Sequence, residues 1–519
     1  MPAPIRKSYP TMLRKIIALV LISAAAALLV LALRQAPSTD RSLMVYCAAG
    51  MKQPVEQIAL QFEKESGTQI ELQFGGTGTL LSQLRIAKKG DLFIAADESS
   101  LEEARKLGVI EESLSLAEQH PVIAVAKGNP KGVQTLADLS RPDIRLALPN
   151  PEAASIGKVA KKLLGNQWEA LAAKAAVMKP TVTEIAADVK LGASDAALVW
   201  DSTVPQFEGL EMIQVPELSA HAEKVSVGVL KSAASSVEAL KFARYLAAPD
   251  KGGAIFQKQG FQIVAGDRWV EKPELILYSG GVNRPAIEGL VQEFASREGI
   301  SVTTVFNGCG ILCAAMKTMK DSTAPKFPDV YYACDVCFVP PVAEHFPEAI
   351  LLTEAEIVIA VPKGNPKGIH TLADLAQAGL RVGLCNAEQS TLGFMTAGIL
   401  RSMNLFDSVS KNASSQVPTG DFLVNQLRTG SLDAAVVYRT NLQKQLEHFE
   451  AIALPADKAK AVQPFAVRKD SPNRELGKRL LAYLRAHKES FEKAGFVWRG
   501  DSAPVKSTEL EIPDYLKQK

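Results

Sequence analysis

The chain repeats itself, and this repeat limits its possible folds more than any other feature. The stretch KGNPKGVQTLADL at 127–139 occurs again as KGNPKGIHTLADL at 363–375. The repeat period of about 235 residues is too long for a stacked solenoid unit, so two whole domains of similar fold are expected. Four further pairs of segments align around the match: 45–84 with 277–316, 90–99 with 328–337, 145–157 with 381–393, and 194–202 with 432–440.

Each half alternates short apolar strands with amphipathic helices. The segment after the first strand begins a helix at Pro54 and places apolar residues on one face before Gly67, which is a typical helix stop. Its counterpart in the second half ends before Gly299. Strands that alternate with helices predict an α/β fold with a mostly parallel sheet. We therefore predict domains at 42–270 and 271–519, with the division near 267–273.

The first 41 residues form a separate part. A basic stretch precedes residues 16–33, IIALVLISAAAALLVLAL, which contain no charge. This length is near the minimum for a membrane span, and the basic flank would remain cytoplasmic. Arg34 stands where a signal-peptide cleavage site needs a small residue. We expect an uncleaved N-terminal transmembrane anchor, with the remainder exported; a cleaved signal followed by secretion is the alternative.

Composition and motifs argue against two classes of function. The net charge is +2, and no long basic run follows residue 40, so nucleic acid is not expected as a partner. Phosphate-binding P-loops, HExxH and GxSxG motifs do not occur, and the histidines lack ligand spacing. We predict no enzyme and no cofactor. Asp97 and Asp335, which the repeat aligns, are expected to cap helices or fix loops.

Short loops of small residues follow several of the predicted strands. They lie at 47–50, 75–79, 96–100 and 149–155, with a further one near Trp200. In open α/β sheets ligands bind beyond the carboxyl ends of the strands, where helix N-termini offer backbone N–H groups. Several such loops together indicate a site for a small anion held by neutral donors.

At this point each half resembles a periplasmic binding protein of the molybdate-binding type, within the solute-binding proteins of ABC transporters. The resemblance covers nearly all of 42–519, taken twice, and rests on VYCAAGMKQPVEQIALQFEKESG, FGGTGTLLSQL, GDLFIAAD, KGNPKGVQTLADL and SDAALVW with their partners. It implies two lobes per domain that close over an oxyanion. The segments 122–130, 225–233, 357–366 and 463–472 resemble the crossings between lobes.

The family's ligand residues are matched only in part. The serine of the first loop is replaced by Gly50 and Val282, unless Cys47 or Ser279 supplies the group. The hydroxyl of the second loop is kept as Thr77 in the first half and replaced by Cys309 in the second. The tyrosine that the family carries late in its domain corresponds to Trp200 in the first half and to Tyr438 in the second. The ligand residues implied by the resemblance are Cys47, Ala49, Gly50, Gly76, Thr77, Ser155, Trp200, Ser279, Gly281, Gly308, Cys309, Thr391 and Tyr438.

Five of the six cysteines lie in the second half, at ligand-loop positions or one helical turn beyond. Three interpretations remain open. An exported protein favours disulfides, with a link between the 309–313 and 334–337 segments. A soft-metal site is a second interpretation, with Cys309, Cys313, Cys334 and Cys337 as weak candidates, although their spacing is atypical for zinc. Small buried residues without chemistry are the third.

The sequence thus predicts a membrane-anchored tandem solute-binding protein on the periplasmic side of the inner membrane. It would capture a small oxyanion of the molybdate or tungstate type and present it to an ABC permease. Two alternatives stand beside this hypothesis. One is a ferric-ion or other metal-binding protein of the same fold, and the other is a non-transport sensor or scaffold with one degenerate half.

Overall fold

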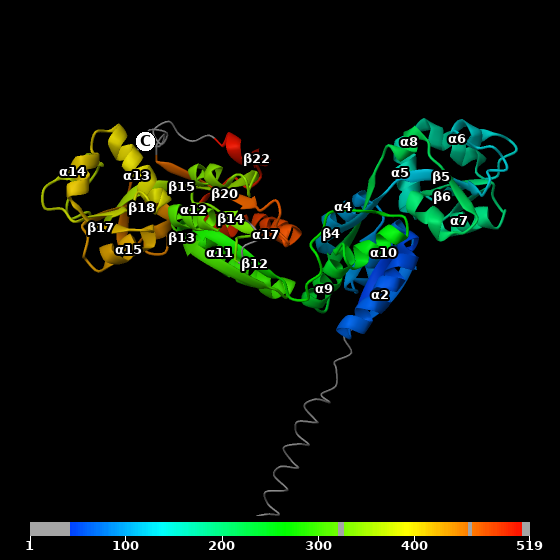
Figure 1. The fold of residues 1–519 in the computed structure, drawn as a ribbon, viewed down its shortest axis with the longest axis horizontal. Helices are drawn as coiled ribbons and strands as arrows, with labels where there is room; N and C mark the ends of the chain where they lie inside the picture. The colour runs from blue at the N-terminus through cyan, green and yellow to red at the C-terminus, as the bar shows by residue number, and fades with distance from the viewer. Residues whose placement is uncertain (1–41, 320–325, 455–458, 511–519) are drawn as a thin grey trace, which may run out of the picture.

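A computed structural model describes residues 42–319, 326–454 and 459–510. The predicted anchor at 16–33 and its linker lie outside these residues. Across the described ranges, no helix has both the length and the apolar character that a membrane crossing needs. The two halves of the chain lie side by side, each divided into two lobes (Figure 1).

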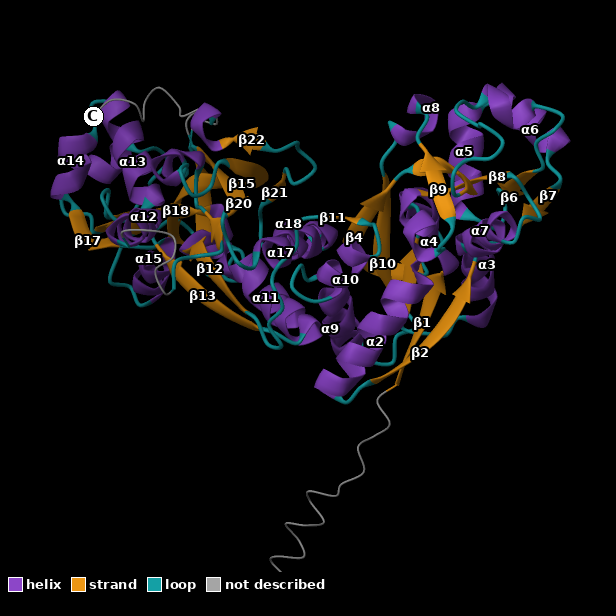
Figure 2. Cartoon of the chain, turned by 45° about the vertical axis from the view of Figure 1, so that its right-hand side comes forward, coloured by secondary structure: helices purple, strands orange, loops and turns teal. Residues whose placement is uncertain are grey.

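In the first half, the lobe that contains the chain's first described residues is built on a six-stranded sheet in the order β11-β4-β10-β3-β1-β2. Helices lie on both faces of this sheet (Figure 2). The strands are β1 (Ser42–Ala48), β2 (Gln69–Gly75), β3 (Leu92–Ala95), β4 (Ile110–Gln119), β10 (Glu223–Leu230) and β11 (Gln262–Ile263). The helices are α2 (Lys52–Ser66), α3 (Thr77–Ala87), α4 (Glu98–Lys106), α9 (Ser236–Ala247) and α10 (Gly252–Lys258).

The other lobe of the first half has a five-stranded sheet in the order β7-β6-β8-β5-β9. Its strands are β5 (Pro121–Ala126), β6 (Leu146–Pro149), β7 (Val177–Lys179), β8 (Ala196–Trp200) and β9 (Leu210–Ile213). Its helices are α5 (Ser155–Leu164), α6 (Asn166–Lys174), α7 (Val182–Lys190) and α8 (Pro216–Ser219).

The second half repeats this plan with one continuous strand through both lobes. Residues 350–356 of β15 pair with β20 in one lobe, and residues 357–360 pair with β18 in the other. The strands are β12 (Glu274–Gly280), β13 (Ser301–Asn307), β14 (Val330–Tyr332), β15 (Glu348–Pro362), β16 (Val382–Cys385), β17 (Ala413–Val417), β18 (Ala434–Tyr438), β19 (Phe449–Ala453), β20 (Lys460–Val467), β21 (Val497–Trp498) and β22 (Val505–Lys506). The helices are α11 (Arg284–Glu298), α12 (Cys309–Thr318), α13 (Thr391–Ser402), α14 (Phe406–Lys411), α15 (Gly420–Arg428), α16 (Arg439–Leu442), α17 (Arg474–Ala486) and α18 (Lys488–Lys493).

The predicted mostly parallel sheets are mixed. The strands that carry the ligand loops do pair in parallel, as β1 does with β2 and β3. However, β10 pairs antiparallel with β3, and β5 pairs antiparallel with β8. The reason is that the chain crosses twice between lobes, and each crossing delivers a strand that runs against its neighbours. In the first half the chain passes between the lobes just before the predicted segments 122–130 and 225–233, because β5 and β10 themselves belong to the sheets. In the second half β15 continues without a turn into the predicted segment 357–366, and residues 463–467 of the predicted segment 463–472 belong to β20.

The predicted helix ends are confirmed, whereas α2 begins at Lys52, two residues before the predicted start at Pro54. Helix α2 buries Val55, Ile58, Ala59 and Phe62 and ends at Gly67, whose φ of 74° is in the left-handed region. Helix α11 ends in the same way at Gly299, with φ of 65°. A residue with a side chain is strained at such a φ, so glycine stops the helix where its apolar face ends. Local pattern therefore decides where these helices lie.

The two halves meet through α9 of the first half and α11 and α17 of the second (Figure 1). The fully buried Glu298, at the end of α11, accepts hydrogen bonds from Arg244 at 2.9 Å and from Arg479 at 2.9 and 3.1 Å. Arg244 also donates to the carbonyl of Glu298 at 2.7 Å. The Asp267 carboxylate accepts two N–H bonds from the first turn of α17. The seam between the halves is therefore held by buried charge-assisted bonds.

Candidate functional site

A small cavity of about 20 Å³ lies between the lobes of the first half. It is bounded by the carboxyl ends of β1, β2 and β3 on one side and by the start of α5 and the end of β8 on the other. Six of the predicted ligand residues line it: Ala49, Gly50, Gly76, Thr77, Ser155 and Trp200. Cys47 does not, because its side chain packs into the hydrophobic core of the first lobe.

Two hydrogen bonds join the lobes across this cavity. The Ser155 hydroxyl donates to the Thr77 hydroxyl at 2.5 Å, and the Gly78 N–H donates to the Ala153 carbonyl at 2.9 Å. Thr77 and Ser155 are buried, although they come from different lobes. The structure therefore shows the first half with its lobes closed and a hydroxyl from each lobe at the same point.

Thr77 and Ser155 are also the first residues of α3 and α5, and no side chain caps either helix. Apart from the Gly78 N–H, which bonds to the Ala153 carbonyl, the first-turn N–H groups and the positive ends of two helix dipoles lie at the cavity. The lining residues described here include no charged side chain. Such an arrangement suits a small anion held by neutral donors.

The sequence did not identify Thr181 and Thr203 as candidate ligand residues. Thr181 lines the cavity and caps α7 through a bond from Glu184 N–H at 3.3 Å. The Thr203 hydroxyl is fully buried near Gly50 and has no hydrogen-bond partner among the described residues. Its position, three residues after Trp200 in the loop leaving β8, is the signal that could have identified it.

The second half has an equivalent cavity of about 10 Å³. Of the predicted residues, Gly281, Gly308 and Tyr438 line it, and Cys334 joins them. Ser279 does not line the cavity; its hydroxyl bonds to the Gly280 carbonyl at 3.3 Å. The other two predicted residues, Cys309 and Thr391, begin α12 and α13 and are fully buried.

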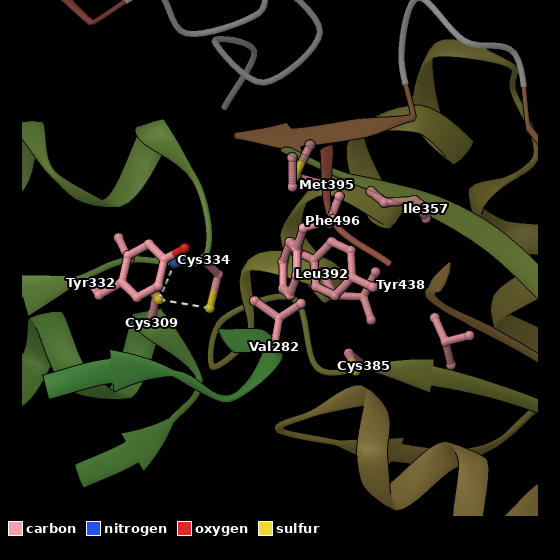
Figure 3. Packing of buried hydrophobic residues seen from close by; sticks show 14 of the residues in the cluster. Val282, Cys309, Tyr332, Cys334, Ile357, Cys385, Leu392, Met395, Tyr438 and Phe496 are labelled. Carbon is pink, nitrogen blue, oxygen red and sulfur yellow. Dashed lines mark hydrogen bonds between the residues drawn. The ribbon is translucent and has the colours of Figure 1, made fainter. Parts of the chain in front are cut away.

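Cys309 and Cys334 form a pair of thiols at this site (Figure 3). Their sulfur atoms are 2.8 Å apart, and the Cys334 N–H donates to Cys309 Sγ at 3.0 Å. Burial alone would raise the pKa of Cys309, but the contacts with the Cys334 thiol and N–H and with the nearby Tyr331 and Thr391 hydroxyls lower it. The bond to Cys309 and burial raise the pKa of Cys334. Cys309 is therefore the thiol of the pair that ionises first.

The remaining cysteines of the 309–337 region are separate from this pair. Cys313 bonds to the Phe338 carbonyl at 3.2 Å, and burial raises its pKa to about 12. Burial and Asp335 raise the pKa of Cys337. No group of three or more metal-ligating side chains occurs in the parts of the chain that the structure describes. The sequence favoured a disulfide between the 309–313 helix and the 334–337 loop. These two segments do come together, through the contact between Cys309 and Cys334, but all six cysteines are free thiols in the structure.

Two hydroxyl groups beside the thiol pair are buried without hydrogen bonds. Tyr438, 3% exposed, lines the cavity, and its hydroxyl has no partner among the described residues. The Thr391 side chain neighbours both thiols, and its hydroxyl makes no hydrogen bond of normal geometry. Burying a hydroxyl without a partner costs free energy, so such groups mark a place where a bound molecule would complete the bonding.

As expected, Asp97 and Asp335 cap and fix their loops. Asp97 accepts from Ser100 N–H at 2.8 Å, while Asp335 accepts from Cys337 N–H and from Val462 N–H at 3.1 and 3.0 Å. Burial raises the pKa of Asp335 to about 6 despite these bonds. Asp335 thus joins the loop that carries Cys334 and Cys337 to β20.

The Asp335 carboxyl predicts a pH dependence of stability. Because its pKa is higher in the folded than in the unfolded chain, its contribution is complete below about pH 4 and is lost as the pH rises to 6. A rise from the usual value near 3.9 to about 6 corresponds to roughly 3 kcal/mol. Asp335→Asn should remove this part of the slope in urea unfolding measured at several pH values. The surface variant Asp374→Asn should retain it, and an unchanged slope in Asp335→Asn would contradict the assignment.

Comparisons with known proteins identify the family of the chain. The family described as bacterial extracellular solute-binding protein matches residues 43–262 and again 275–497. A putative binding protein of Haemophilus influenzae is 29% identical over 222 residues, which cover 42% of this chain and 90% of that protein. The molybdate-binding protein ModA of Mycobacterium bovis is 25% identical over 224 residues, covering 43% of this chain and 84% of that protein.

Among solved structures, the periplasmic molybdate-binding protein of Azotobacter vinelandii has a TM-score of 0.38 and 22% identity, covering 43% of this chain and 100% of that one. The family match extends over most of the described chain and recurs with the period of the internal repeat. The chain therefore belongs to the family of bacterial extracellular solute-binding proteins and carries the family's domain twice.

Proposed function

We propose that this chain is a periplasmic solute-binding protein that captures a small oxyanion of the molybdate or tungstate type and presents it to an ABC permease. The observation that carries the proposal is the first cavity, where Thr77 and Ser155 bring a hydroxyl and a helix N-terminus without a side-chain cap from each lobe to one point. Closure around these groups would surround an oxyanion with N–H and O–H donors. Trp200, which lines the same cavity, offers a further N–H donor.

The lining of the first cavity favours an anion over ferric iron. Its described residues include no carboxylate, histidine or tyrosine, whereas a ferric ion needs anionic oxygen ligands. The relatives named as molybdate-binding proteins support the same class of ligand. The choice among molybdate, tungstate and sulfate rests on the size of the closed cavity and is decided by titration.

The proposed location is the periplasmic side of the inner membrane. Residues 16–33 would anchor the chain there, with 42–270 and 271–519 as the two exported domains; secretion after cleavage is the alternative. We propose that this chain binds the solute and that a separate permease transports it. No catalytic step is assigned to it.

Calorimetric titration of the full chain tests the proposal. Molybdate, tungstate, sulfate and ferric iron are added in turn, and the expected result is tight binding of one of the oxyanions with a rise in melting temperature. Binding of ferric iron alone would overturn the proposal in favour of a metal carrier. Absence of binding by every oxyanion would overturn it as well.

Replacing Thr77 should weaken this binding. Thr77→Ala removes one hydroxyl that would donate to the anion, and a hydrogen bond to a charged group contributes at least about 1.5 kcal/mol. We expect roughly a 10-fold higher Kd for the preferred oxyanion. Thr77→Ser keeps the hydroxyl and is the matched control, which should bind within a few-fold of the parent. Equal affinity in Thr77→Ala and the parent would show that this hydroxyl does not contact the anion.

A further inference from the structure

The two cavities are built on one plan but differ in chemistry. Where the first half has Thr77 and Ala96, the second has Cys309 and Cys334. The second half also has a glycine, Gly280, where the first has Ala48, and a Cβ at Gly280 would overlap the Cys334 sulfur. The glycine therefore gives the thiol the room that a methyl group fills in the first half.

Both thiols belong to the buried core of the second half, and one of them also reaches the cavity. Cys334 lines the cavity, and the Cys309 sulfur contacts the Cys334 sulfur at 2.8 Å (Figure 3). Tyr438 lines the same cavity with a buried hydroxyl that has no partner in the described structure. One thiol, with a second in contact with it, and a hydroxyl without a partner among the described residues thus lie at one small space.

We propose that the second domain binds a trivalent oxo acid of a thiophilic element, of the arsenous acid type, through Cys309 and Cys334. The inference rests on the proposed function in one respect, the use of each interlobe cavity for a small ligand. Two thiols condense with such an acid, E(OH)₃. Two S–H bonds and two E–O bonds break, two E–S bonds form, and each thiol proton leaves with a hydroxide as water. The element stays trivalent, so no oxidant or reductant is needed.

The surroundings favour this ligand over a soft cation. A monovalent soft cation held by two thiolates would form a buried anion, and the described residues that line the cavity include no cation to balance it. The condensation product is neutral. It also keeps one hydroxyl on the element, which can accept the hydrogen bond that the Tyr438 hydroxyl lacks. A bare cation offers no oxygen to that hydroxyl.

The lowered pKa of Cys309 supports the chemistry, because the thiolate is the attacking form. The other cysteines do not offer an equivalent pair. Cys385, at the end of β16, is buried with its pKa raised to about 12, and Cys313 bonds to a carbonyl. The proposed site is therefore specific to two of the six cysteines.

The test uses the full chain, reduced with a phosphine that contains no thiol. The protein is incubated with arsenite, desalted, and analysed for arsenic per chain and for free thiols. The expected result is one arsenic per chain with the loss of two titratable thiols. The double variant Cys309→Thr with Cys334→Ala, which installs the residues of the first half, should retain no arsenic. Cys385→Ala is the control and should retain as much as the parent.

A second variant, which adds the thiol pair to the first half, keeps the test decisive if the double variant fails to fold. Ala48→Gly, Thr77→Cys and Ala96→Cys together rebuild the thiol pair in the first half, and this variant should retain a second arsenic. Equal retention of arsenic by the parent and by the Cys309→Thr, Cys334→Ala variant would overturn the inference. A parent protein that retains silver(I) through the two thiols but retains no arsenic would also overturn it. Molybdate is titrated in parallel. Molybdate binding without arsenic retention would overturn the inference and leave the proposed function intact.

Discussion

Glu298→Ala is expected to lower the free energy of unfolding by about 3–5 kcal/mol. The Glu298 carboxylate is fully buried between Arg244 of the first half and Arg479 of the second, whose side chains are only 10% and 12% exposed. Removing the carboxylate takes away the counter-charge that both guanidinium groups bond to directly, and leaves Glu112 and Asp267 as the more distant carboxylates. Removing one member of a buried ion pair lowers the free energy of unfolding by this amount because the remaining charges stay buried without their partner. Urea unfolding followed by fluorescence measures the effect.

Glu293→Ala is the matched control, since Glu293 lies on the same helix but is exposed and accepts a single long bond from Tyr483 at 3.3 Å. It should change stability by less than about 1 kcal/mol. The pH dependence offers a second check. Although burial opposes it, the two arginines hold the pKa of Glu298 below its usual value. Its contribution is therefore present above about pH 4.3 and is lost at lower pH, so the parent and Glu298→Ala should converge there. A constant difference would contradict the assignment.

The sequence predicted most of the elements but not how they pair. Helix α2 follows from the spacing of Val55, Ile58 and Phe62 and from Gly67, all of which act within one stretch of chain. The antiparallel pairing of β10 with β3 depends on a return crossing more than a hundred residues later in the chain, and no local pattern encodes it. For this reason the helix ends at Gly67 and Gly299 are confirmed, while the mostly parallel sheets are corrected to mixed ones.

The same distinction applies to the site. The internal repeat aligned Thr77 with Cys309, so the exchange of a hydroxyl for a thiol was visible in the sequence. That Cys309 contacts Cys334 depends on β13 and β14 lying on either side of β12, which only the sheet order reveals. The buried and unpartnered hydroxyls of Thr203 and Tyr438 were also out of reach, because a missing partner is a property of packing.

Closure of the lobes should be the step on which affinity depends most strongly, and Gly76→Ala tests it. Gly76 precedes α3 with φ of −66°, a conformation that alanine adopts without strain. In the closed lobes, however, a Cβ there would overlap the backbone carbonyls of Ala153 and Pro180 from the other lobe. Overpacking of this kind costs about 1–3 kcal/mol, and backbone atoms yield less readily than side chains. We expect Kd for the preferred oxyanion to rise about 100-fold, with the melting temperature of the free protein little changed.

Two further glycines make this experiment specific to closure. Gly308, the counterpart in the second half, would overlap the Gln389 carbonyl in the same way, so Gly308→Ala should impair ligand retention in the second domain and leave oxyanion binding in the first unchanged. A Cβ added at Gly289 on α11 would meet no described atom within 4 Å, so Gly289→Ala should bind both ligands as the parent does. Parent-like oxyanion affinity in Gly76→Ala would contradict closure over the ligand at this point. Because the two lobes touch here through main-chain atoms, a single methyl group is sufficient to separate a closed domain from an open one.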